Sequence, residues 1–260
     1  MSTLVLATGE TYSPPSAGYL EFPPIFGAVT KPMLLAIMAT LIISVFFLAA
    51  TRNMKIVPGK FQYLAESIYS FGRNNIAREQ IGSAEFRPFV PLILALFTFL
   101  LVNNLFGLIP VTKFPTMAQI GFPLALSLLV VYPVYHIAGM RKHGFFGYFK
   151  NQLFPPGAPW PVYILLAPIE FFSKFVVNPL TLAVRVFAAM FAGYMLILVF
   201  AGAGTFLLVH GEGLLYAVAG LSYLGVIAIT FLEALIMTIQ AFIFALLSAS
   251  YIGMALAEEH

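Results

Sequence analysis

Cysteine and aspartate are both absent from this chain of 260 residues, and charge of either sign is scarce. Without cysteine the chain has no disulfide, no thiolate metal site and no cysteine nucleophile. Charged residues make up 9% of the sequence and hydrophobic residues 61%, whereas a soluble domain carries roughly 25% charged residues. So much apolar surface requires lipid as its solvent. The composition therefore predicts an all-α integral membrane protein in a lipid bilayer.

Other kinds of reactive or binding site are missing as well. The net charge of +3 is small and the basic residues are scattered, so the chain lacks the dense basic face that nucleic-acid binding needs. The four histidines are too dispersed for a metal motif, and there is no glycine loop for phosphate. We predict no metal, no cofactor, no nucleic-acid partner and no nucleotide chemistry. Residues 1–25 also lack the basic start and apolar run of a signal peptide.

Three apolar runs have the length of about 20 residues that a membrane span needs. They are 32–51, 88–109 and 121–140, and Pro133 predicts a kink in the third. The stretch 59–80 instead places apolar residues at helical spacing among charged ones. A soluble surface helix has the same pattern, but the flanking spans favour an amphipathic helix at the membrane interface.

The turn HGEG at 210–213 divides the rest of the chain into two long apolar stretches, 161–209 and 214–257. A helix over the second stretch would be on the order of 66 Å long, whereas the hydrocarbon core is only about 30 Å thick. Each stretch is therefore either two spans with a tight turn or one strongly tilted helix. Residues 214–257 contain no Pro, Asn or Asp, which favours one tilted helix packed against a protein partner. The predicted fold has about three ordinary transmembrane helices, one interfacial helix and two long tilted helices.

The distribution of Lys and Arg predicts the orientation of the membrane domain, 31–260. Residues 52–87 contain six of these cations, and residues 141–150 add three more, whereas the first 30 residues contain none. The positive-inside rule then places residues 1–30 outside as an extracytoplasmic segment, and the C-terminus in the cytoplasm. This pattern favours a multi-pass protein of a bacterial plasma membrane.

Charges inside the last two stretches are informative, because a charge at the bilayer centre costs about 2.5–3.5 kcal/mol and usually marks function. Glu170 and Lys174 have the spacing of a helical ion pair, which would neutralise itself. Arg185 has no acidic residue within a few turns, and its guanidinium stays protonated. Its partner is therefore either Glu233 of the last helix or a carboxylate of another chain.

Small residues share the helix face of Arg185, namely Ala188, Ala189 and Ala192. Small side chains let a second helix approach closely in lipid. The face is therefore either an internal helix contact or a docking groove for a foreign helix that carries a carboxylate.

A polar strip lies on one face of the last helix, where Glu233 and Gln240 are seven residues apart and Thr230 and Met237 accompany them. Such a strip holds water and passes protons, although polar contacts between helices produce the same pattern.

Several segments resemble subunit a of F-type ATP synthases, and the resemblance covers roughly 30–260. They are PLTLAVRVFAAMFAGY at 179–194, EALIMTIQAFIFALLSASYIGMALAEEH at 233–260 with the especially specific IQAFIF at 239–244, VNNLFGLIP at 102–110 and PGKFQYLAE at 58–66. The resemblance implies a non-catalytic, proton-translocating stator subunit. In this family two long tilted helices curve around a ring of subunit c hairpins, and an arginine separates two water-filled half-channels. The implied partners are the subunit c ring, the peripheral-stalk subunit b and other ATP synthase subunits.

The resemblance also implies the residues of the proton path. By their places in the two motifs these are Arg185 as the separating arginine, Gln240 facing it, Glu233 and Tyr194 in the outer half-channel, Glu170 at the inner half-channel and Thr181 one turn before the arginine. Three positions depart from the family pattern. Ala189 stands where many members have Asn, Gly107 where some have Asp, and Tyr194 where Glu or His is frequent. Since tyrosine has a reference pKa of about 10, the outer path is expected to depend mainly on Glu233 and water.

Two other functions are compatible with a helical membrane protein. A stand-alone ion channel or secondary transporter predicts paired repeats and broken helices in matching halves, and the sequence has neither. A membrane scaffold without an ion path leaves Arg185, Glu233 and Gln240 without a reason to lie in the membrane.

Overall fold

The computed structural model describes residues 4–5, 11–16, 18, 23–109, 112, 114–154 and 160–257. The predicted cytoplasmic tail, 258–260, and parts of the predicted N-terminal segment lie outside these residues. Within them, most of the chain is helical, and two short strands, β1 (Leu4–Val5) and β2 (Thr11–Tyr12), pair antiparallel. Five of the helical stretches are long and apolar enough to cross a membrane. The predicted all-α integral membrane class is therefore confirmed.

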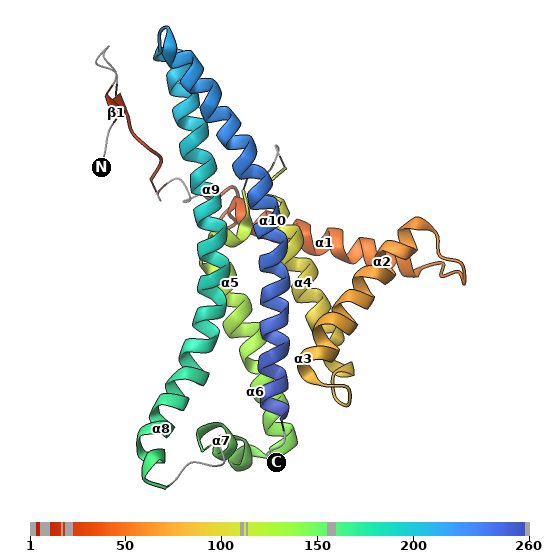
Figure 1. Ribbon diagram of the computed structural model, residues 1–260. Coiled ribbons are helices and arrows are strands. Elements are labelled where there is room, and N and C mark those ends of the chain that lie inside the picture. The colour runs from red at the N-terminus through yellow and green to blue at the C-terminus, as the bar shows by residue number, and fades with distance from the viewer. Residues whose placement is uncertain are drawn as a thin grey trace.

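The first two helical stretches form an arm beside the main bundle (Figure 1). Helix α1 spans Lys31–Thr51 and begins with a proline at its N-terminus, where the missing N–H needs no partner. The segments α2 (Lys60–Ser70), η2 (Phe71–Arg78) and α3 (Glu79–Ile81) follow one another without a break. This extent matches the helix expected over 59–80, while its place at the membrane interface stays a prediction.

Helix α4 ends earlier than the apolar run predicted. The short turn η3 (Arg87–Phe89) leads into α4 (Val90–Leu105), four residues short of the predicted end at 109. After Leu105 the backbone tightens into turns, with hydrogen bonds from the N–H of Gly107 to the carbonyl of Asn104 and from Leu108 to Leu105. The hydroxyl of Thr112 donates to the carbonyl of Phe106. This side-chain bond takes up a carbonyl at the helix end, which hydropathy alone does not reveal.

The middle of the chain is continuous from α5 (Gly121–Ala125) through η5 (Leu126–Val131) to α6 (Tyr132–His143). The wider turns of η5 directly precede Pro133, whose ring removes one N–H from the helical hydrogen-bond series. The short η4 (Thr116–Ala118) precedes this stretch, and α7 (Phe145–Leu153) follows it.

The two long stretches at the C-terminal end are single helical runs. Helix α8 (Trp160–Phe172), η6 (Ser173–Val177) and α9 (Asn178–His210) follow without a break, and α10 spans Leu214–Leu256. For both stretches the structure thus has one long helix rather than two spans with a tight turn. Figure 1 shows α9 and α10 running antiparallel, with their turn at one end of the molecule and α7, α8 and the C-terminus at the other.

The core lies where α10 packs on α9, α4 and α6. Its fully buried side chains are, by helix, Ile93 and Leu100 of α4, Leu182, Val186 and Met190 of α9, and Met237, Phe244 and Ile252 of α10. In lipid this packing is stabilised by close van der Waals contact, because lipid tails are as apolar as leucine. By contrast, α10 exposes 77% of Phe231. This outer surface remains available to lipid or to another subunit.

We expect Phe244→Ala to lower the free energy of unfolding by about 3–5 kcal/mol, because the side chain is fully buried and its loss leaves a cavity. Unfolding of the purified chain in mixed micelles, followed by circular dichroism, measures this change. Phe231→Ala removes an exposed ring from the same helix and should change the stability by less than about 0.5 kcal/mol. Equal losses in the two variants would contradict the placement of the core.

Candidate functional site

Glu233 is a buried carboxyl group at the contact between the two long helices. It lies on α10 with 2% of its surface exposed. Its carboxylate occupies the space into which a Cβ atom at position 193 of α9 would project, so Gly193 permits the contact. The Oε1 atom has no hydrogen-bond partner among the described residues. A buried polar atom of this kind calls for water or for a proton.

The contact between Gly193 and Glu233 defines how α9 and α10 are aligned. Further along the same antiparallel pair, a Cβ atom at Gly204 would lie 3.1 Å from the ring of Tyr223. Because the helices run in opposite directions, residues that precede Gly193 on α9 lie beside residues that follow Glu233 on α10. Arg185 is eight residues before Gly193, so it lies level with position 241, eight residues after Glu233. Gln240 therefore lies at the level of Arg185, and it is 7% exposed with an unpartnered Nε2.

Arg185 faces outward from α9 and is exposed, unlike Glu233 and Gln240. The ion pairs found among the described residues, Lys142–Glu85 and Lys174–Glu170, do not include it. Neutralisation by Glu233, one of the two alternatives, is thus not seen.

A second group of buried polar atoms lies near Glu233, and its members were not identified from the sequence as site residues. The amide of Asn104 donates to the carbonyl of Met237, one turn from Glu233, at 3.4 Å. The Oδ1 atoms of Asn103 and Asn104 and the hydroxyl of Thr116 are buried without a partner. The segment η4, which carries Thr116, packs against α9 and α4. The sequence feature that could have identified this group is the pair of adjacent asparagines within an apolar run.

The remaining predicted residues near this region differ in exposure. Tyr194 is half-buried, and its ring meets that of Phe114 edge-on with centroids 5.4 Å apart. Thr181 is exposed, one turn before Arg185. At Gly107, a Cβ atom would lie 2.8 Å from Met237 and 3.1 Å from Pro115. An aspartate at position 107 would therefore require Met237 and Pro115 to shift.

A cavity of about 470 Å³ with several polar side chains in its lining lies at the opposite end of α9 and α10 from their turn. Its walls come from α6, α7, η6 and the end of α10, and its polar lining includes Tyr135, His143, Asn151, Lys174, Asn178 and Tyr251. The hydroxyl of Tyr148, which also lines it, is 2.6 Å from Nδ1 of His136. That bond holds α7 in the wall, and burial raises the pKa of the Tyr148 hydroxyl above its ordinary value.

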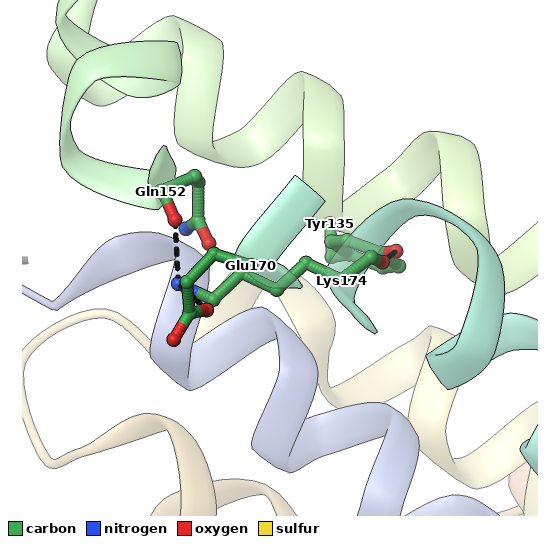
Figure 2. A network of polar contacts seen from close by, with 4 residues as sticks. All are labelled: Tyr135, Gln152, Glu170 and Lys174. Carbon is green, nitrogen blue, oxygen red and sulfur yellow. Dashed lines mark hydrogen bonds and ion pairs between the residues drawn. The ribbon is translucent and has the colours of Figure 1, made fainter. Parts of the chain in front are cut away.

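Glu170 lies beside this cavity and forms the ion pair that its spacing predicts. Its Oε2 is 3.1 Å from Nζ of Lys174, and the same ammonium donates to the carbonyl of Gln152 at 2.8 Å (Figure 2). The hydroxyl of Tyr135 donates to the backbone carbonyl of Lys174 at 3.1 Å. About a quarter of the Glu170 side chain is exposed. The carboxylate is therefore paired but still accessible to water.

These features define an integral membrane protein of helical type with two polar regions, one on each side of an exposed, unpaired arginine. Among the described residues no group of three or more metal-binding side chains is present. Comparison with known proteins narrows the class further. A sequence model of the family described as ATP synthase A chain matches residues 33–253. The chain belongs to the ATP synthase subunit a family.

Named relatives support this assignment over nearly the whole chain. Subunit a of a Nocardioides species is 41% identical over 274 residues, covering 100% of this chain and 98% of the relative. That of Streptomyces lividans is 42% identical over 230 residues, covering 88% and 80%. That of Rhodococcus erythropolis is 37% identical over 268 residues, covering 100% and 96%. Membership places the chain in the membrane sector of a bacterial ATP synthase and in proton transport linked to ATP synthesis.

We expect Gly193→Ala to displace the Glu233 carboxylate, because the added methyl group takes the same space. Under the role proposed below for Glu233, proton transport should fall roughly 10- to 100-fold, the loss expected when a reacting group moves by about 1 Å. ATP-driven proton uptake by inverted membrane vesicles measures the loss. Gly220→Ala is the matched control, since a Cβ atom there meets nothing within 4 Å. The shorter Glu233→Asp should restore part of the activity of Gly193→Ala, and an undiminished Gly193→Ala would contradict this contact.

Proposed function

We propose that this chain provides two proton half-channels separated by Arg185 and couples proton flow to rotation of the subunit c ring. One polar region, around Glu233, forms the outer half-channel. The cavity beside Lys174 and Glu170 forms the inner one. The observation that carries the proposal is the unpaired, outward-facing Arg185, which lies between them along α9. Such a cation requires a carboxylate from outside the chain.

The proposed role of Arg185 follows from electrostatics. A guanidinium keeps its proton in proteins, and a cation near the bilayer centre costs about 2.5–3.5 kcal/mol if it is not neutralised. A ring carboxylate that comes opposite Arg185 is stabilised in its charged form by the attraction. The same permanent cation repels a proton between the half-channels. Each proton crossing then releases about 2.3 kcal/mol per 100 mV, which drives rotation only if direct leakage is blocked.

The surface around Arg185 suits a passing helix. Ala188 and Ala192 are exposed on the same side of α9, and Ala189 is half-buried. Small side chains allow a neighbouring helix to approach closely, so we assign this face to the hairpins of the subunit c ring. Subunit b and other subunits of the complex are further proposed partners. The orientation we propose follows the Lys and Arg distribution, with the N-terminus outside and the C-terminus in the cytoplasm.

In the proposed outer path, protons pass from water to Glu233 and then to the ring. The unpartnered atoms of Asn103, Asn104 and Thr116 offer hydrogen bonds to water along the way. Tyr194 borders this path, and Gln240 faces the junction. In the proposed inner path, protons leave the ring near Thr181 and reach the cytoplasm through the cavity beside Glu170.

We expect Arg185→Ala to abolish proton-driven ATP synthesis while the complex remains assembled, because the ring carboxylate loses its counter-ion and the barrier to leakage disappears. ATP synthesis and passive proton flux in vesicles test both effects. Arg52→Ala removes an exposed arginine at the end of α1 and serves as the control. Near-normal synthesis by Arg185→Ala would remove Arg185 from the proposed role.

We expect Glu233→Gln to slow proton entry by roughly 10²-fold, a typical contribution of a positioned proton carrier. The amide keeps the shape of the side chain but does not exchange a proton. Proton uptake should be measured from about pH 6 to 9, a range chosen around ordinary carboxylate and histidine titration. Unchanged rates over this range would count against Glu233 as a carrier.

A further inference from the structure

A groove of about 790 Å³ lies between the start of α4 and the end of α6, apart from the two polar regions described above. This volume is within the roughly 300–1,000 Å³ of ordinary ligand sites. Its walls are mostly apolar, and they include Phe89 and Leu92 on one side and Val134 and Ile137 on the other. Both helices are long and apolar enough to cross a membrane. The groove therefore opens where two membrane helices leave the hydrocarbon.

Two basic residues lie at the groove, but only one has its charge neutralised. Lys142 forms an ion pair with Glu85 at 2.8 Å and donates to the backbone carbonyl of Leu256 at 2.8 Å. It thereby ties both walls to the end of α10. Arg141, also in the lining, is exposed. It takes part in neither of the ion pairs found among the described residues. Among the described residues that line the groove, the charge left outside the Lys142–Glu85 pair is that of Arg141.

We propose that this groove binds one anionic phospholipid, with its phosphate on Arg141 and its acyl chains along the apolar walls. Three observations favour this occupant. The unmatched guanidinium offers the planar donors that suit phosphate. The walls below it are apolar, as acyl chains require. Basic pockets between membrane helices at the cytoplasmic boundary are known to take anionic headgroups. A peptide helix from another subunit is the alternative occupant, and the experiment below distinguishes it from a lipid.

The test uses the complete ATP synthase in nanodiscs that contain a phosphatidylglycerol analogue with a photoreactive group near the top of one acyl chain. After illumination, mass spectrometry maps labelled peptides of this chain. We expect labelling at 84–92 and 134–142 that exceeds the labelling by a matched phosphatidylcholine analogue. Arg141→Gln should lower it about fivefold, the effect of losing one basic contact, whereas Arg141→Lys should retain most of it.

Arg52→Gln is the matched control, because it removes an exposed arginine at the end of another membrane helix, outside the groove. Assembly of each variant is checked by the amount of this chain that co-purifies with the complex. Equal labelling by both lipids, or labelling that survives Arg141→Gln, would overturn the proposal. So would crosslinks from a photoreactive residue at position 137 to another subunit instead of lipid. If Arg141→Gln does not assemble, the comparison of the two lipids on the unmodified complex still decides.

Discussion

The carboxylate of Glu233 lies where a side chain at position 193 would be, and this contact fixes how the two longest helices are aligned. A Cβ atom at position 193 would lie in the space of the carboxylate, so this level of α9 accepts Glu233 because it carries a glycine. The alignment in turn brings Gln240 to the level of Arg185. It also commits the acid of α10 to the helix contact, where it does not reach the arginine. The alignment of the polar residues of α9 and α10 therefore depends on the absence of a side chain at Gly193.

Arg185 has no ion-pair partner among the described residues, and an unpaired charge in lipid has a free-energy cost. This cost favours the binding of a carboxylate from another chain. In lipid, the cost of the exposed charge is recovered only when a carboxylate arrives from outside. An internal salt bridge between Arg185 and Glu233 would remove the attraction for an external carboxylate. The face of small residues around Ala188 would then have no charge to attract a second helix. The proposed rotary function needs a counter-ion that binds and leaves repeatedly. A partner on a moving ring meets this requirement, and a partner within the same chain does not.

Local pattern was sufficient for much of the fold and for part of the site. Apolar runs predicted the membrane helices, the absence of turn residues predicted the single α10, and spacing predicted the Glu170–Lys174 ion pair. The end of α4 was predicted too late, because a hydrogen bond from Thr112 intervenes. Asn104, Thr116 and Tyr251 were not identified, since each depends on contacts between segments far apart in the sequence. The alignment of α9 with α10 likewise requires the structure, because a glycine in an apolar helix carries no sign of which residue fills its space.

The two polar regions differ in a way that bears on the choice between a stand-alone channel and a stator. Around Glu233 several polar atoms are buried and unpartnered, whereas Lys174 is ion-paired and lines a cavity. Between these regions, at the level of Arg185, the inner faces of α9 and α10 are closed by apolar side chains such as Val186 and Phe244, both fully buried. Under the proposed function, a proton that enters at Glu233 would meet packed hydrocarbon on the inside and a fixed cation on the outside. The remaining route runs through a carrier on a neighbouring subunit, which is the requirement that separates a rotary stator from a channel that conducts alone.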